Sequence, residues 1–160
     1  MTLSSFIQKH VHLLCGALLC VGLSSALALP PAGNIIVTER RLNHALSSFH
    51  SDLKTEAKKT LARPPENENW KLYFVAHLKK AAGDTRVNLV FYDASQPAKP
   101  GREPVHFAEI NTQPTAKVLM SDVELRPDQG FKEGGKYQVL ITRLINGKEE
   151  VYARTQVELK

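Results

Sequence analysis

The sequence predicts a mainly β protein, an antiparallel β-sandwich preceded by one amphipathic helix. Three observations lead to this fold class. One segment carries apolar residues at three- and four-residue steps, later segments alternate apolar and polar residues with a period of two, and turn signals recur about every ten residues. The same elements also allow an α+β fold in which the helix lies on an antiparallel sheet. A length of 160 residues and a hydrophobic content of 42% suit one small domain.

The amino-terminal segment predicts export. Residues 1–12 hold one formal positive charge, and residues 13–23 form an uninterrupted run of apolar residues and glycine that includes both cysteines. Small residues up to Ala28 then supply a signal-peptidase site, so we expect a signal peptide over residues 1–28 and a periplasmic or secreted location. Residues 29–37 are expected to form a linker. Without cysteines or an Asn-x-Ser/Thr acceptor, the mature chain suits a bacterial envelope or exterior.

An amphipathic helix is predicted over residues 38–63. Thr38 suits the N-cap position, and Arg63-Pro64-Pro65 ends the pattern. The apolar face is formed by Leu42, Ala45, Leu46, Phe49, Leu53, Ala57 and Leu61. The opposite face is basic, and five of its cations are the candidate contact residues for a partner: Arg40, Arg41, Lys54, Lys58 and Lys59.

A β-sandwich domain is predicted over residues 70–160. The period-two segments place strands at 70–79, 87–92, 105–110, 118–125, 137–145 and 149–159. In the first of these strands, Trp70, Leu72 and Phe74 belong to the buried side. Asn146-Gly147 separates the last two strands and favours a two-residue type I′ turn, because both residue types tolerate positive φ. The last two strands are therefore expected to form a hairpin.

The stretch from Phe131 to Val139 contains the pattern Gly135-Lys136-Tyr137-Gln138-Val139. This pattern resembles the start of the penultimate strand in immunoglobulin-like and fibronectin-type sandwiches. The resemblance implies that the hydroxyl of Tyr137 turns back onto the preceding corner. The paired cysteines of that family are absent, since Val139 stands where the second would be. The exported layout is also similar to that of small envelope proteins of Gram-negative bacteria.

No motif in the sequence predicts catalysis, a cofactor or a metal site. His77 and His106 lie on predicted strands, but the sequence has no His-x-His or His-Glu-x-x-His pattern that would join histidines at one metal. The aspartates are too scattered for a calcium loop, and no Gly-x-Ser-x-Gly motif occurs. We therefore expect a protein that is not an enzyme and that binds no cofactor and no metal.

Two function classes remain for such a chain. The favoured one is a non-catalytic exported module, binding or structural, that contacts a protein or an anionic envelope component. The alternative is a cystatin-like protease inhibitor, because a helix followed by an antiparallel sheet resembles the order of that fold, although the Gln-x-Val-x-Gly loop is absent. Nucleic acid is not expected as a partner of an exported chain whose aromatic residues lie at core positions. A membrane surface is a less favoured partner, and the residues hold no indication of oligomeric state.

Overall fold

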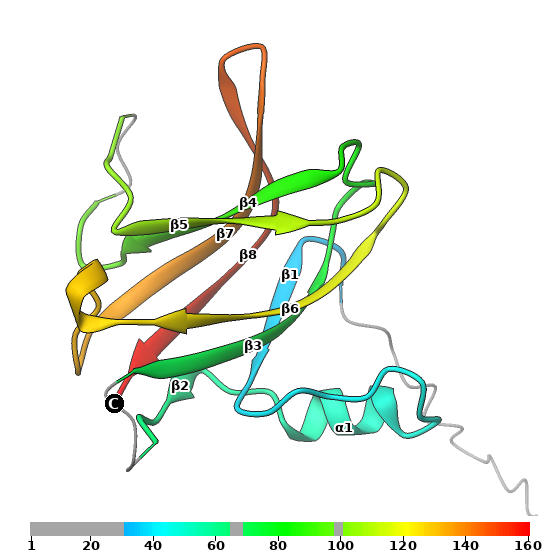
Figure 1. Cartoon of the computed structure of the whole chain (residues 1–160), viewed down its shortest axis with the longest axis horizontal. Helices are drawn as coiled ribbons and strands as arrows, with labels where there is room; N and C mark the ends of the chain where they lie inside the picture. Colours follow the sequence, from blue (N-terminus) through cyan, green and yellow to red (C-terminus); the bar gives the residue numbers. More distant parts are fainter. Residues whose placement is uncertain (1–30, 65–68, 98–100) are drawn as a thin grey trace, which may run out of the picture.

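The computed structural model describes residues 31–64, 69–97 and 101–160, and within them the chain forms eight β-strands, one α-helix and one 3-10 helix (Figure 1). In chain order they are β1 (Asn34–Thr38), α1 (Phe49–Thr55), β2 (Thr60–Leu61), β3 (Trp70–His77), β4 (Arg86–Asp93), β5 (His106–Asn111), β6 (Val118–Leu125), the 3-10 helix η1 (Pro127–Gln129), β7 (Lys136–Ile145) and β8 (Lys148–Leu159). The mainly β prediction is confirmed. The signal peptide predicted over residues 1–28 lies outside the described residues.

All eight strands belong to one hydrogen-bonded sheet. Its order is β5-β4-β7-β8-β1-β3-β6, and β2 pairs with β8 beside this path. The strands β1 and β2 run parallel to β8, whereas the other pairs are antiparallel. Figure 1 shows that the sheet curls like a barrel, so the two layers expected of a sandwich are opposite walls of one sheet. The end strands β5 and β6 leave the curl open.

The interior of the curled sheet is the main core. On β3 the predicted alternation is confirmed, because Trp70, Leu72 and Phe74 are buried inside the sheet while Lys71 is exposed. Val75 faces the opposite side and is nevertheless buried, since it packs in a second apolar cluster outside the barrel. The outer face of β3 is therefore covered in part, and this covering layer forms the site described below.

The hairpin predicted at Asn146-Gly147 is confirmed. Both turn residues have positive φ, 52° for Asn146 and 74° for Gly147, as a type I′ turn requires. The two strands pair from Ile145 opposite Lys148 onward, with a register shift beside Ile141. Because β7 also pairs with β4 and β8 with β1, this hairpin joins the two halves of the sheet.

Tyr137 forms the corner that the immunoglobulin-like pattern implies. Its hydroxyl accepts the backbone N–H of Lys132 at 3.0 Å and donates to the carbonyl of Gly130 at 3.4 Å. The ring is buried and packs edge-to-face on Phe131, with centroids 5.0 Å apart. A Cβ on Gly135 would lie 2.6 Å from the Tyr137 hydroxyl oxygen, so only glycine leaves room for the ring. The resemblance read from the Gly-x-Tyr spacing is thus confirmed in its geometry.

The helix predicted over residues 38–63 is wrong in extent. Residues 34–38, partly inside the predicted linker, form β1, and only Phe49–Thr55 is α-helical. The run Ile35-Ile36-Val37 explains β1, because its β-branched side chains favour a strand and its backbone pairs with β3. None of the helices in the described ranges is long and apolar enough to cross a membrane.

Local hydrogen bonds keep the chain between β1 and α1 irregular. Thr38 does not cap a helix; its hydroxyl donates to the carbonyl of Arg40 at 2.8 Å. The side-chain oxygen of Asn43 accepts the N–H of Ala45 at 3.0 Å, which turns the chain again before α1. Such side-chain-to-backbone bonds compete with helix formation. Leu46, predicted on the buried face, is 53% exposed as a result.

Candidate functional site

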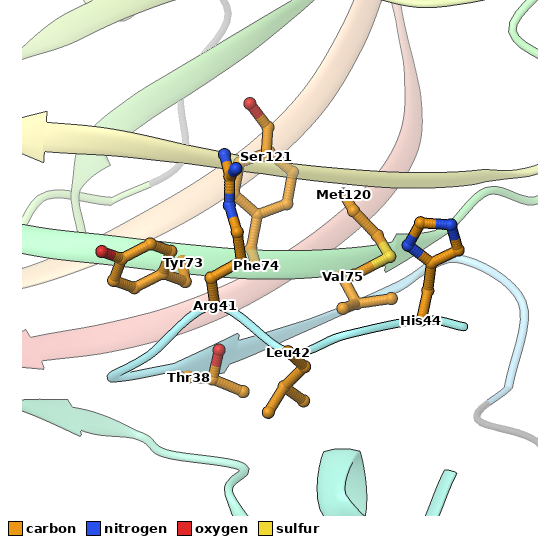
Figure 2. Close-up of a pocket in the computed structure, with 9 residues that line it drawn as sticks. All are labelled: Thr38, Arg41, Leu42, His44, Tyr73, Phe74, Val75, Met120 and Ser121. Atoms are coloured by element: carbon orange, nitrogen blue, oxygen red, sulfur yellow. The ribbon is translucent and has the colours of Figure 1, made fainter. Parts of the chain in front are cut away.

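A groove lies between the irregular segment 39–48 and the outer face of β3 and β6. Its volume is about 250 Å³, and it is lined by Thr38, Arg41, Leu42, His44, Tyr73, Phe74, Val75, Met120 and Ser121. Figure 2 shows Arg41 reaching from the segment toward β6, with His44 and Met120 together at the other end. The lining combines apolar groups, hydroxyls and basic side chains, which suits recognition of a mixed surface.

Leu42 fixes the segment 39–48 against the sheet. It is buried in the second apolar cluster, which consists of Leu42, Phe49, Leu53 and Val75. Burying a leucine side chain contributes about 1.5–3 kcal/mol, enough to hold a segment that lacks regular hydrogen bonds of its own. The exposed residues on either side of Leu42, among them Arg41 and His44, then line the groove.

Two cations converge on one carboxylate at the edge of this groove. Arg41 Nη2 lies 2.6 Å from Asp122 Oδ1, and Lys71 Nζ lies 3.8 Å from Asp122 Oδ2. Asp122 is directly opposite Tyr73 in the β3–β6 pairing, and Lys71 Nζ lies 5.3 Å from the centroid of the Tyr73 ring. The cations come from two separate parts of the chain, the 39–48 segment and β3, and Glu124 lies directly opposite Lys71 in the same pairing.

Two other predicted contact cations, Arg40 and Lys58, are paired with carboxylates within residues 39–59. Arg40 Nη2 lies 2.8 Å from Glu56 Oε1, and this hydrogen bond lowers the pKa of Glu56. Lys58 Nζ lies 3.9 Å from Glu39 Oε2. These exposed pairs reduce the charge that the segment presents to a partner, because each cation already has an anionic neighbour.

The remaining two predicted cations lie apart from the groove. Lys54 is exposed in the last turn of α1. Lys59 lines a different hollow, together with Gln138 on β7 and Arg154 on β8. Of the five predicted contact residues, Arg41 is therefore the one that lines the groove, and the structure does not gather all five on one face.

His77 and His106, for which no sequence motif indicated a shared metal, do not lie on neighbouring strands. His77 ends β3 and His106 begins β5, and these strands are not neighbours in the sheet. In the described ranges no group of three or more histidine, cysteine, aspartate or glutamate side chains is arranged to hold a metal ion. Burial lowers the pKa of both histidines, and the charge of nearby His50 lowers that of His77 further. His106 packs edge-to-face on Phe131, with centroids 5.9 Å apart.

Sequence reasoning found Arg41 but missed the other half of the site. Met120 and Asp122 lie two residues apart on β6 and share its outer side. Met120 is 37% exposed. An exposed methionine next to an acidic residue on the outward side of a strand was the available signal. No local sequence pattern predicts which strand pairs with β6. The approach of Arg41 to Asp122 was therefore not predictable either.

No family model matches the chain, and no curated protein matches it. Among solved structures, an immunoglobulin-like protein from Pseudomonas aeruginosa is similar to it. The two share 15% sequence identity, and the match covers 84% of this chain and 99% of the other, with a TM-score of 0.40.

Proposed function

We propose that the chain is a non-catalytic binding module of the bacterial envelope or exterior. It contacts a partner protein or an anionic envelope component through segment 39–59 and the adjoining outer face of β3 and β6. The observation that carries this proposal is the groove itself, in which the partly exposed Met120 and the edges of the buried Leu42 and Val75 lie near the basic Arg41. Apolar area with a few placed polar groups is the usual composition of a recognition surface.

The arrangement of polar groups favours binding over catalysis. His44 and Ser121 both line the groove, yet within the described part of the chain no hydrogen bond joins them. The neighbouring carboxylate of Asp122 is held by Arg41 and Lys71 rather than by a histidine. A nucleophilic site needs a base within hydrogen-bond reach of the nucleophile and an acid that orients the base. The groove instead supports charge recognition.

The charge balance favours an anionic partner. Segment 39–59 holds five lysines and arginines against three acidic residues. A surplus this small attracts an acidic surface weakly and is screened by salt beyond about 8 Å at physiological ionic strength. The export signal that the sequence predicts over residues 1–28 supports a partner in the envelope or outside the cell.

No observation favours the cystatin-like alternative. That hypothesis needs a long helix held by the sheet, whereas the α-helix in the described residues spans seven residues. It lies on the outer side of the curled sheet, as Figure 1 shows.

A charge-reversal experiment tests the proposal. The variant Lys54→Glu, Lys58→Glu, Lys59→Glu should fold normally but associate less with an acidic envelope fraction or with anionic vesicles. The matched control reverses three exposed lysines elsewhere, Lys79, Lys117 and Lys148, and so makes the same change in net charge. Binding is measured at low and at physiological ionic strength, and equal binding by wild type and both variants would contradict the proposed contact surface.

A further inference from the structure

The geometry points to a second binding site, for a phosphate group, in the hollow between β8 and the end of segment 39–59. The volume of this hollow is about 390 Å³, and none of the described residues that line it is acidic. They are Lys59, Gln138, Arg154, Thr155 and Gln156. The site goes beyond the proposed function, because these residues are separate from those that line the groove at β3 and β6.

The hollow lies where one edge of β8 has no neighbouring strand. Along this edge β1 pairs with β8 at Arg154, and β2 pairs with it from Glu158 onward. The N–H of Arg154 donates to the carbonyl of Gly33 at 3.0 Å, and that of Glu158 to the carbonyl of Lys59 at 2.9 Å. Alternate residues of a strand direct their N–H groups to the same edge, so the N–H of Gln156 points there too. In the described residues it has no acceptor, and it is therefore available to a ligand.

The two cations of the hollow have no carboxylate partner. Both Lys59 and Arg154 are exposed, and neither forms an ion pair within the described ranges. The arginines that do form ion pairs there are Arg40, Arg41, Arg63, Arg86, Arg126 and Arg143. The charge of Arg154 is thus available to an anion that arrives from solvent.

The acidic residues close to the hollow are already paired with other cations. Glu158 lies opposite Lys136 in the β7–β8 pairing, and its Oε2 is 4.0 Å from Lys136 Nζ. Glu56 precedes Lys59 on the other side of the hollow, and its Oε1 is 2.8 Å from Arg40 Nη2. Neither carboxylate lines the hollow. The lining itself therefore carries positive charge that an anion would offset.

Gln138 adds donors whose orientation is fixed. Its Oε1 accepts from Arg102 Nη2 at 3.1 Å, so the other end of the amide, Nε2, keeps its N–H donors for a ligand. The guanidinium of Arg102 is held in turn over the ring of Tyr92, 4.2 Å from the centroid. Glu149, which accepts from the Tyr92 hydroxyl at 3.4 Å, does not line the hollow. Arg102 thus places a further cation behind Gln138.

This set of donors suits a phosphate group better than a carboxylate. The guanidinium of Arg154 and the ammonium of Lys59 come from opposite sides of the hollow, and the N–H of Gln156 lies on the strand between them. A phosphate monoester has nearly two negative charges and three acceptor oxygens that point in different directions, whereas a carboxylate has one charge and two oxygens in a plane. The volume is within the roughly 300–1,000 Å³ of small-molecule pockets, which leaves room for the group that carries the phosphate.

The test is an NMR titration of the purified, nitrogen-labelled protein at constant ionic strength. The soluble probes are inorganic phosphate and glycerol 3-phosphate. The backbone amide signal of Gln156 should shift along a saturating curve, because its N–H gains an acceptor. Arg154→Gln should weaken binding by about tenfold, as loss of a charged hydrogen bond predicts, and Lys59→Gln should weaken it several-fold.

The controls repeat the same substitutions at exposed residues that do not line the hollow. Arg86→Gln on β4 and Lys117→Gln just before β6 should leave the affinity for both probes unchanged. Acetate at the same ionic strength provides the carboxylate comparison and should bind more weakly than phosphate. Thermal melts verify that every variant folds.

A second arm identifies the source of the phosphate group. Sedimentation with phosphatidylcholine vesicles, with and without phosphatidic acid, measures binding to a lipid phosphate. Binding of the soluble probes that is weakened in Arg154→Gln supports the site for a soluble phosphate ester. Binding only to the vesicles with phosphatidic acid, weakened in the same variant, supports the site and assigns it to a lipid head group.

The remaining outcomes overturn the inference. They are binding of no phosphate probe in either arm, acetate bound as tightly as phosphate, and equal affinity in wild type and Arg154→Gln. Because Lys59 also belongs to the proposed contact surface, Arg154→Gln separates the two proposals. If it leaves phosphate binding unchanged while the triple lysine reversal still weakens association with the envelope fraction, this inference fails and the proposed function stands. If phosphate binding depends on Arg154 and the triple reversal has no effect on that association, the reverse holds.

Discussion

The indole N–H of Trp70 donates a hydrogen bond to the backbone carbonyl of Lys160, 2.8 Å away. Trp70 begins β3 and is fully buried, whereas Lys160 follows β8 directly. The guanidinium of Arg63 lies over the indole, 4.2 Å from the ring centroid, and the N–H of Arg63 donates to the same carbonyl at 2.7 Å. One carbonyl therefore joins β3 to the chain that follows β2.

This relationship predicts an asymmetric mutational result. Trp70→Phe removes the indole donor and leaves a small cavity, so the free energy of unfolding should fall by about 2–3 kcal/mol. Lys160→Ala retains the carbonyl and should change stability by less than about 0.5 kcal/mol. Chemical denaturation measures both, and equal losses in the two variants would contradict this asymmetry.

At Tyr137, two variants measure the contributions of the hydroxyl and of the ring to stability separately. Tyr137→Phe keeps the packing on Phe131 and removes two backbone contacts, so it should cost about 1 kcal/mol. Tyr137→Ala also empties a buried site and should cost about 3–5 kcal/mol. The difference between the variants in denaturant midpoint checks this order. If neither variant changes the free energy of unfolding, the structural role of the corner is refuted.

The cluster under α1 should control the groove without controlling the barrel. Phe49→Asp places a charge among Leu42, Leu53 and Val75 and should detach α1 and the 39–48 segment. In this variant, hydrogen–deuterium exchange should show faster backbone amide exchange in residues 39–55 than in wild type. The amides of β7 and β8 should stay protected. Leu46→Asp is the control, because Leu46 is exposed and outside the cluster. Global unfolding of the Phe49 variant would show that the cluster belongs to the main core.

Stability should decrease below pH 6.5. Burial, assisted by the charge of His50, lowers the pKa of His77 below 6.5, and its Nε2 is buried with no hydrogen-bond partner in the described structure. The unfolded chain therefore takes up the proton first, and stability that is present above pH 6.5 is lost as pH falls toward the folded-state pKa. His77→Gln should flatten part of this slope in melts between neutral and mildly acidic pH. His106 contributes in the same direction, so the remaining slope should fall further in the double variant with His106→Gln.

Export should leave Leu29 as the amino terminus. The order of charge, apolar run and small residues up to Ala28 predicts a signal and its cleavage site. Intact-mass spectrometry of protein purified from an envelope or culture fraction of a producing bacterium measures the processed mass. A mass that includes Met1 would contradict cleavage, as would a melting temperature that depends on reductant, since Cys15 and Cys20 would then be retained.

Features encoded by neighbouring residues were predictable. The alternation from Trp70 to Ala76 and the Asn146-Gly147 turn depend on spacings of one or two residues, and the structure confirms both. The helix was overextended because Leu42, Phe49 and Leu53 match a helical period, although Leu42 reaches its cluster from an irregular segment. The period of the apolar residues predicts which side chains are buried on one side. It does not establish that the backbone between them is helical.

The site could be predicted only in part for the same reason. Arg41 stood out through its basic neighbours, but its partner Asp122 is 81 positions away in the sequence. Their meeting depends on β3 pairing with β6 and on the 39–48 segment crossing over both strands. A single sequence contains no local signal for such a long-range contact.

The place of the last hairpin in the sheet sets the order in which the protein can fold. Strands β4 and β5 can pair early, and so can β1, β3 and β6, but in the sheet these two groups are joined by hydrogen bonds only through β7 and β8. A chain that emerges amino end first therefore carries two separate, incomplete sheets until residues 136–159 arrive. Completion of the curled sheet is therefore a late, long-range step, and such steps are slow. Until that step the two partial sheets leave the strand edges next to β7 and β8 unpaired.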